Sequence, residues 1–158
     1  MRRYATGVLV VLAVLVAASC DLVRVPAPEL QVITRAKPGD EPADLASGLT
    51  MEFGKPGNGV NEDVVVTIRN IGDADLILEA AAPHYVAIVD QNEAEKPFSI
   101  AIGADTNSIG PGEEVSVTVR FVGQSTSTRY AAKLLIPSND PEHPDYHLEL
   151  VGDGDGFN

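Results

Sequence analysis

The strictest pattern in the chain is a seven-residue run in which apolar and polar side chains alternate without exception. It covers residues 115–121 and reads Val-Ser-Val-Thr-Val-Arg-Phe. Successive side chains of an extended strand point to opposite faces, so this period of two places every apolar side chain on one face. Pro111 and Gly112 precede the run as turn residues, and residues 123–128 follow as a polar loop. We therefore expect a half-buried β-strand with one face on a core.

Eight further short runs are rich in valine, isoleucine, leucine or aromatic residues and are bounded by turn residues. They cover residues 29–34, 51–54, 63–70, 76–78, 85–89, 98–102, 129–136 and 146–151. In the third run Val64, Val66 and Ile68 share one face. No segment after residue 20 keeps a helical period of 3.6 residues, and no internal repeat is present. About seven to nine short strands therefore predict an all-β chain folded as one antiparallel β-sandwich.

The charge of the chain limits its partners. It has 23 acidic and 11 basic residues, which gives a formal net charge of −12 at pH 7. Such a chain repels phosphate backbones and anionic lipid headgroups. We therefore expect no nucleic-acid partner, whereas a basic protein or a cation fits the charge better.

The first 20 residues are organised as an export signal. Arg2 and Arg3 supply positive charge, residues 8–16 are continuously apolar, and residues 17–19 are small. Cys20, the only cysteine, follows directly, and this order resembles the lipobox of bacterial lipoproteins. The resemblance implies cleavage before Cys20 and acylation of the sulfur and of the new amino group. Two or more acyl chains anchor a protein stably in a membrane.

Two alternatives for this segment stay open. Residues 4–20 carry no charge and are long enough to span a bilayer uncleaved, or the signal is an ordinary one and Cys20 is incidental. We favour lipidation because disulfides need cysteines in pairs, and Cys20 has no second cysteine. Cleavage removes two arginines and no acid, which lowers the net charge from −12 to −14. Asp21 resembles an inner-membrane retention signal whose rule varies between lineages, so the choice between inner and outer membrane is undecided.

Three stretches of the mature chain resemble ASH domains (the ASPM/SPD/Hydin type), whose bacterial members are often labelled choice-of-anchor D. Phe53-Gly54 followed by residues 64–76 resembles their "FG … strand, N-x-G, small residues, L" signature. Residues 109–121 resemble the "I-x-P-G" turn and the strand after it. Residues 136–141 together with 148–154 resemble the "I-x-S-N-D-P … L-x-G-x-G" ending.

The ASH resemblance covers nearly all of residues 28–156 and implies an immunoglobulin-like sandwich that serves adhesion, scaffolding or interaction without catalysis of its own. Residues 1–19 are then the lipoprotein signal peptide, and residues 20–27 are a short tether. The motif residues have structural explanations. Asn70 and Gly72 are expected to take the left-handed backbone of a tight turn.

Two other motif positions are also explained by turn chemistry. Pro111 and Gly112 suit a turn, because proline fixes one backbone dihedral and glycine frees the next. We expect the Asp140 carboxylate to cap its own turn, which Pro141 stiffens.

Two groups of residues are candidates for holding a metal ion. His143, Asp145 and His147 occupy alternate positions and point the same way from an extended strand. Same-face neighbours start roughly 7 Å apart, at about 3.3 Å rise per residue, so one adjacent pair can chelate but hardly all three. Asp153 and Asp155 resemble the first half of a calcium loop, with oxygen donors on alternate residues. A solvated strand face and a frayed acidic terminus are the alternative interpretations.

The sequence offers no recognisable catalytic arrangement. No serine sits in a G-x-S-x-G elbow, and the glycines at 54, 57 and 59 lack the lysine-serine pair and the helix of a phosphate loop. We therefore expect no enzyme and no cofactor. We therefore predict a bacterial cell-envelope lipoprotein that is tethered through Cys20. Its domain is expected to bind or scaffold a protein or glycan partner. A metal-dependent role and a purely structural surface protein are the alternatives.

Overall fold

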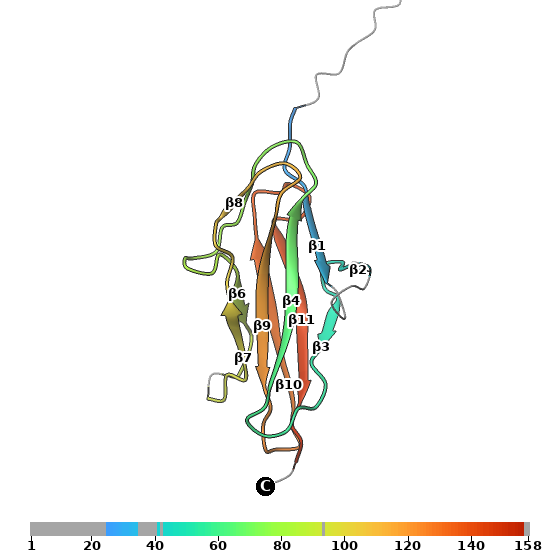
Figure 1. The fold of residues 1–158 in the computed structure, drawn as a ribbon, viewed down its shortest axis with the longest axis vertical. Helices are drawn as coiled ribbons and strands as arrows, with labels where there is room; N and C mark the ends of the chain where they lie inside the picture. The colour runs from blue at the N-terminus through green and yellow to red at the C-terminus, as the bar shows by residue number, and fades with distance from the viewer. Residues whose placement is uncertain (1–24, 35–40, 42, 93, 157–158) are drawn as a thin grey trace, which may run out of the picture.

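The structure is a computed structural model that describes residues 25–34, 41, 43–92 and 94–156. Within these residues the chain forms eleven strands and no helix (Figure 1). The strands are β1 (Leu30–Thr34), β2 (Ala43–Asp44), β3 (Thr50–Glu52), β4 (Asn61–Asn70), β5 (Leu76–Ile77), β6 (Ala87–Val89), β7 (Phe98–Ile102), β8 (Ser108–Ile109), β9 (Glu114–Val122), β10 (Arg129–Pro137) and β11 (Asp145–Asp153). A helix able to cross a membrane is accordingly absent from the described ranges.

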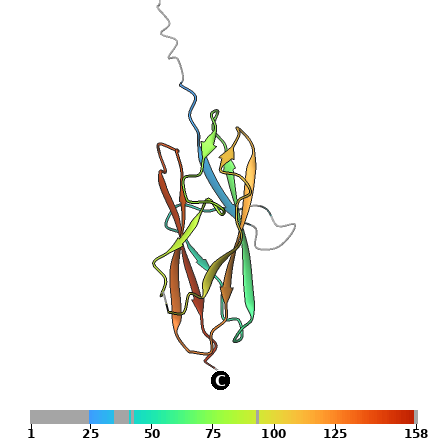
Figure 2. The same cartoon turned by 90° about the vertical axis from the view of Figure 1, so that its left-hand side faces the viewer.

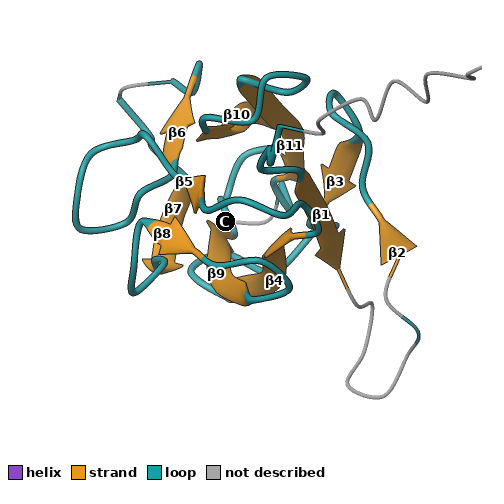
Figure 3. Cartoon of the chain, turned by 90° about the horizontal axis from the view of Figure 1, so that it is seen from above, coloured by secondary structure: helices purple, strands orange, loops and turns teal. Residues whose placement is uncertain are grey.

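The strands form two sheets that pack face to face, as Figure 2 shows from the side and Figure 3 from above. One sheet has the order β2-β1-β4-β9-β7, the other has the order β3-β11-β10-β6, and β5 and β8 form a separate short pair. Every pairing is antiparallel except that of β3 with β11, which is parallel. The predicted all-β sandwich is therefore confirmed, with one parallel pair at an edge.

The core lies between the two sheets and is built from the alternating strands. In β9, Val117, Val119 and Phe121 are fully buried, as the sequence pattern predicts. The Phe121 ring lies 4.8 Å from that of Phe98, and the Phe98 ring lies 5.5 Å edge-on from that of Phe53 (distances between ring centroids). Such aromatic contacts stabilise a core beyond the area that they bury.

The chain moves from one sheet to the other shortly after β1. β2 pairs with β1 in the five-stranded sheet, and β3 then pairs with β11 in the four-stranded sheet. Between them the Leu45 N–H donates to Val32 O at 2.8 Å, and the Gly48 N–H donates to His147 O at 2.8 Å. We call residues 45–49 the strand switch, because their backbone bonds first to one sheet and then to the other.

The edges of both sheets are short. The four edge strands have two to five residues each. On β7 the Gln91 side-chain amide bonds both backbone groups of Phe98, at 3.2 and 3.3 Å, and a bulge interrupts the register between Ile100 and Ile102. Short, capped and bulged edges offer little to a partner strand. Loops and side-chain surfaces are therefore better placed for recognition than an open edge.

The described chain begins at one end of the long axis of the sandwich and finishes at the other (Figure 1). Loops 71–75, 110–113 and 138–144 lie at the end where residues 25–29 lead into β1. The loops 54–60 and 123–128 lie at the opposite end, beside the C-terminus, and bond to each other there. The two ends of the sandwich thus carry different loops.

Candidate functional site

Residues 27–30 lead into β1 and are held by several hydrogen bonds. The Ile71 N–H donates to Glu29 O at 2.9 Å, and the Asp73 N–H donates to Ala27 O at 3.0 Å. The Ala27 N–H donates in turn to the Asp73 carboxylate at 2.8 Å. Two buried polar side chains complete an arrangement that we call the N-terminal clasp. Its residues are Ala27, Glu29, Leu30, Asn70, Ile71, Asp73 and Asp140.

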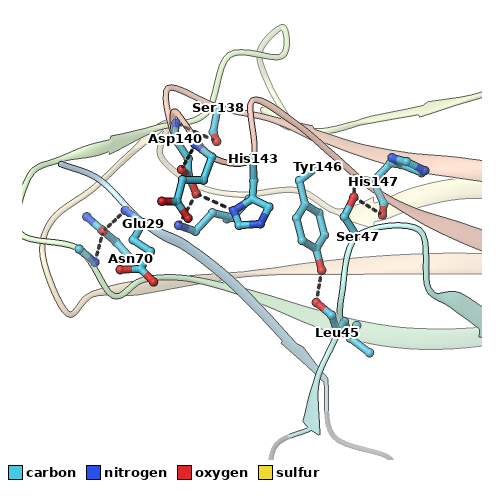
Figure 4. A network of polar contacts seen from close by, with 12 residues as sticks. Glu29, Leu45, Ser47, Asn70, Ser138, Asp140, His143, Tyr146 and His147 are labelled. Carbon is cyan, nitrogen blue, oxygen red and sulfur yellow. Dashed lines mark hydrogen bonds and ion pairs between the residues drawn. The ribbon is translucent and has the colours of Figure 1, made fainter.

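Asn70 is the central side chain of the clasp and is completely buried. Its Nδ2 donates to Ala74 O at 2.7 Å and to Ile109 O at 2.8 Å. Its Oδ1 accepts the Gly72 N–H at 3.0 Å and the Glu29 N–H at 3.4 Å. One amide therefore joins the β4–β5 loop, the end of β8 and the segment that leads into β1. Figure 4 shows Asn70 beside Glu29.

The expected left-handed backbone at Asn70 and Gly72 is wrong. Asn70 ends β4, and neither residue has a positive φ. Position 72 requires glycine for a different reason, because a Cβ there would lie 2.3 Å from Ala27 O and 2.5 Å from Glu29 N. The turn at Gly112, with φ of 78°, does match the prediction.

Asp140 fastens the start of β1 to the loop before β11. Its side chain is 1% exposed, and it accepts the N–H of Leu30 at 2.9 Å and that of Glu142 at 2.8 Å. The second bond is the predicted cap of its own turn. Burial alone would raise the pKa of Asp140, but these two N–H groups and His143 outweigh it and hold the pKa below its usual value of 3.8.

The Asp140 carboxylate also fixes the chemistry of His143. Nδ1 of His143 lies 3.3 Å from Asp140 Oδ2. Because Asp140 is ionised near neutral pH and has no proton to give, Nδ1 must carry the proton. In the neutral form of the ring Nε2 is then an acceptor, and no described residue hydrogen-bonds to that nitrogen.

A surface hollow of about 280 Å³ lies where the strand switch leaves β1. We call it the switch notch. Its lining residues are Leu30, Gln31, Val32, Asp44, Leu45, Ala46, Ser47, Ile71, His143 and Tyr146. The lining combines apolar side chains from β1 and the strand switch with one carboxylate and one imidazole, and it contains no lysine or arginine among the described residues.

The polar groups of the switch notch are held in place by hydrogen bonds among its lining residues. The Gln31 side-chain amide donates to Asp44 Oδ1 at 2.8 Å, and the Tyr146 hydroxyl donates to Leu45 O (Figure 4). Burial, with a smaller effect from the nearby Asp44 charge, raises the pKa of Tyr146 to about 12. The Tyr146 hydroxyl thus stays protonated at neutral pH and keeps its bond to the strand switch.

Sequence reasoning did not find the notch. Asp44 belongs to a two-residue strand with no pattern of its own, and Leu45 follows it in a segment that reads as loop. The SNDP motif did single out Asp140. His143 follows Asp140 by three residues and lies within reach of its carboxylate. This spacing is the sequence signal that points to the switch notch.

The predicted histidine group is divided by the structure. Asp145 and His147 lie on the outward face of β11, with Nδ1 of His147 3.4 Å from Asp145 O and its Nε2 3.8 Å from the Glu149 carboxylate. His143 precedes the strand and contacts Asp140 instead. In the described ranges no three histidine, cysteine or acidic side chains come together as metal ligands would. The metal hypothesis stays a prediction without a formed cluster to support it.

The two terminal aspartates also have partners within the protein. Asp153 lies 3.4 Å from Arg129, and Oδ2 of Asp155 accepts the Asn58 N–H at 2.9 Å. Both carboxylates therefore fasten the end of β11 to neighbouring segments. Cys20 and the predicted signal peptide lie outside the described residues.

The comparisons with known proteins agree with this architecture. Residues 47–153 match the family of HYDIN/CFA65/VesB-like, Ig-like domains. A crystal structure of a protein of unknown function from Porphyromonas gingivalis W83 is similar at TM-score 0.50 and 17% identity, covering 84% of this chain and 67% of that one. The ASH/PapD-like domain (PapD-like domain 7) of human CEP192 is similar at TM-score 0.50 and 13% identity, covering 97% of both chains.

A weaker similarity extends to the secreted serine protease VesC from Vibrio cholerae, at TM-score 0.48 and 18% identity. It covers 65% of this chain and 21% of that one. A search of curated proteins gave no match. At these identities the solved structures show a shared fold, and the CEP192 domain agrees with the ASH resemblance of the sequence. The family match spans well over half of the chain, which therefore belongs to the HYDIN/CFA65/VesB-like immunoglobulin-like domains.

Proposed function

We propose that this protein is a bacterial envelope lipoprotein whose sandwich is a non-catalytic binding or scaffolding module held at a membrane through Cys20. The observation that carries the proposal is where the chain enters the domain. Cys20 precedes Ala27, the first residue of the clasp, by seven positions. Seven extended residues span about 25 Å at most. An acyl group on Cys20 would therefore hold the clasp end of the sandwich close to the bilayer.

The clasp supports this proposal because it secures the segment on which such an anchor would pull. The tether would lead directly into residues 27–30, whose backbone is bonded to Asn70, Ile71, Asp73 and Asp140. Those bonds connect the tether to both sheets at once, since Asn70 ends β4 and Asp140 precedes β11. A module that works at a fixed distance from a membrane needs a firm attachment of this kind.

A non-catalytic role is supported by the side chains themselves. A nucleophile is activated by a base within hydrogen-bond reach. Across the described ranges no serine hydroxyl bonds to a histidine ring; Ser47, for example, bonds only to the backbone of His147. His143 is held by Asp140, and within the described ranges no serine or threonine hydroxyl hydrogen-bonds to its ring, although Ser47 lines the same hollow.

Intact-mass analysis of the protein extracted from membranes tests the tether, with Cys20→Ser as the variant. We expect a chain that begins at Cys20 and carries the added mass of acyl groups, and a loss of both in Cys20→Ser. A full-length or unacylated wild-type chain would overturn the lipoprotein proposal and leave the sandwich as a module without this anchor.

A further inference from the structure

The switch notch combines an apolar floor with fixed acceptor groups. Leu30 and Val32 of β1 are almost fully buried beneath it, and Leu45 and Ile71 are partly exposed at its sides. A volume of about 280 Å³ is enough for one long side chain rather than for a whole small molecule of drug size.

The polar groups on the rim of the notch select the charge of an occupant. Asp44 is exposed and is positioned by Gln31 through one carboxylate oxygen, which leaves the other oxygen to accept a further bond. When the His143 ring is neutral, its Nε2 is the second acceptor, because Asp140 holds the proton on Nδ1. A ligand that brought only acceptors would find no partner at either atom, whereas an ammonium group has three donors and no acceptor.

We propose that the switch notch receives a lysine side chain presented by a partner protein. The aliphatic stem would lie along Leu45 and Ile71, and the ammonium group would bond to Asp44 and to Nε2 of His143. Long basic side chains bury their stem on apolar surface while the charge stays at the rim. The net charge of −12 favours the approach of a basic partner in the same way. This inference rests on the proposed binding role and names the chemistry of the partner.

Nuclear magnetic resonance titration of the mature, membrane-extracted chain in detergent tests the proposal. The probe is the blocked peptide acetyl-Ala-Ala-Lys-Ala-Ala-amide, and the reference is the same peptide with norleucine in place of lysine. We expect saturable shifts of the Leu30, Leu45 and Ile71 amides with the lysine peptide, and at least tenfold weaker binding of the norleucine peptide. Equal effects of the two peptides, or shifts confined to other parts of the chain, would overturn it.

Asp44→Asn and Glu62→Gln form a matched pair of charge-neutral variants. Asp44 lines the notch, whereas Glu62 is an exposed residue at the opposite end of β4. We expect Asp44→Asn to weaken binding of the lysine peptide at least fivefold and Glu62→Gln to leave it unchanged. Equal weakening by both would indicate attraction by net charge alone and would reject the notch.

A capture experiment with the same variants separates this proposal from the broader one. If wild type and Asp44→Asn retain the same envelope partner, and the lysine peptide causes no shifts, the binding module stands and the notch is wrong. If neither chain retains a partner while the lysine peptide binds the wild type through Asp44, the notch stands as a lysine site.

Discussion

Asn70 shows at the scale of one residue how a side chain can take the place of backbone pairing. Replacing Asn70 by alanine would leave the carbonyls of Ala74 and Ile109 and the N–H of Gly72 without their partner. Each buried polar group left unpaired costs about 1–3 kcal/mol. We expect Asn70→Ala to lower the free energy of unfolding by about 2–4 kcal/mol, measured by urea denaturation.

Asn92→Ala is the control for Asn70→Ala. Asn92 also bonds through its side chain, to Ala94 N and Glu95, but it lies in an exposed turn. Exposed substitutions of this kind change stability by about 0.5 kcal/mol or less. Similar losses in the two variants would show that burial of the Asn70 amide is not what stabilises the clasp.

Asp140 makes stability depend on pH in a definite direction. The pKa of its carboxyl is below 3.8 in the folded chain, so folding favours the ionised form. Its contribution is complete above the pKa of the unfolded chain, about 3.9, and is lost as pH falls through the lower folded value. We expect Asp140→Asn to lower the free energy of unfolding by about 2–4 kcal/mol at pH 7. The difference in this free energy between the variant and wild type should shrink below about pH 4.

Asp63→Asn provides the comparison for this pH profile. The hydrogen bond from Arg120, opposed by a smaller effect of burial, lowers the pKa of Asp63 as well. The pair is exposed on the outer face of β4 and β9, where solvent screens it. Urea denaturation from pH 3 to pH 7 should therefore show a smaller pH-dependent difference for Asp63→Asn. An equal or larger one would contradict the role of Asp140.

The roles of these residues were only partly readable from the sequence. The motif around Asp140 predicted a capped turn, which is a local contact two residues away. Its bond to Leu30 spans 110 positions and depends on how the sheets pack. For Asn70 the turn chemistry of neighbouring residues suggested a backbone role, and the tertiary contacts gave the side chain a different one.

At the scale of elements, Gly72 sets how closely the β4–β5 loop approaches the segment that leads into β1. A methyl group at this position would lie 2.3 Å from Ala27 O, too close to backbone that has no side-chain freedom to move. We expect Gly72→Ala to push residues 27–29 away and to speed hydrogen exchange of the Ile71 and Asp73 amides at least tenfold. Exchange within β9 should change much less.

Gly57→Ala is the matched control for Gly72→Ala. Gly57 lies at the other end of the sandwich, does not have a positive φ, and would place its new methyl group 3.5 Å from Val60, an ordinary contact. We expect unchanged exchange at Ile71 in this variant. The steric explanation would be refuted if hydrogen exchange of the clasp amides became faster in Gly57→Ala, or if it did not become faster in Gly72→Ala.

Strands whose sequence alternates between apolar and polar residues could be predicted. Strands that exist only because a neighbouring strand pairs with them could not. The alternation of residues 115–121 gives β9 and its buried face directly. β2 and β8 have two residues each, too few for any period, and exist because a neighbouring strand supplies the ladder. The parallel pairing of β3 with β11 depends on the strand switch, which reads in the sequence as a plain loop.

For the whole molecule, the elongated sandwich has a clasp end and a C-terminal end that are joined by β4 and β9. β4 has ten residues, so the ends lie roughly 30 Å apart at about 3.3 Å per residue. The loops of the clasp end carry Asp73, Asp75, Glu113 and Glu142. If Cys20 is acylated, these acids would face the headgroups and be repelled by an anionic bilayer. The sandwich would then stand away from the surface rather than lie along it.

Two single-cysteine variants measure this orientation in the lipidated chain, in which the Cys20 sulfur is consumed by the lipid. Asp75→Cys places a fluorophore at the clasp end, and Asn58→Cys places one at the C-terminal end. In vesicles with quencher-labelled headgroups, we expect stronger quenching at position 75 than at position 58, because position 58 lies roughly 30 Å farther along the sandwich from the tether. High salt should reduce the repulsion and raise quenching at both positions. Stronger quenching at position 58 than at 75 would mean that the domain is held in the opposite orientation, and equal strong quenching would mean that it lies flat.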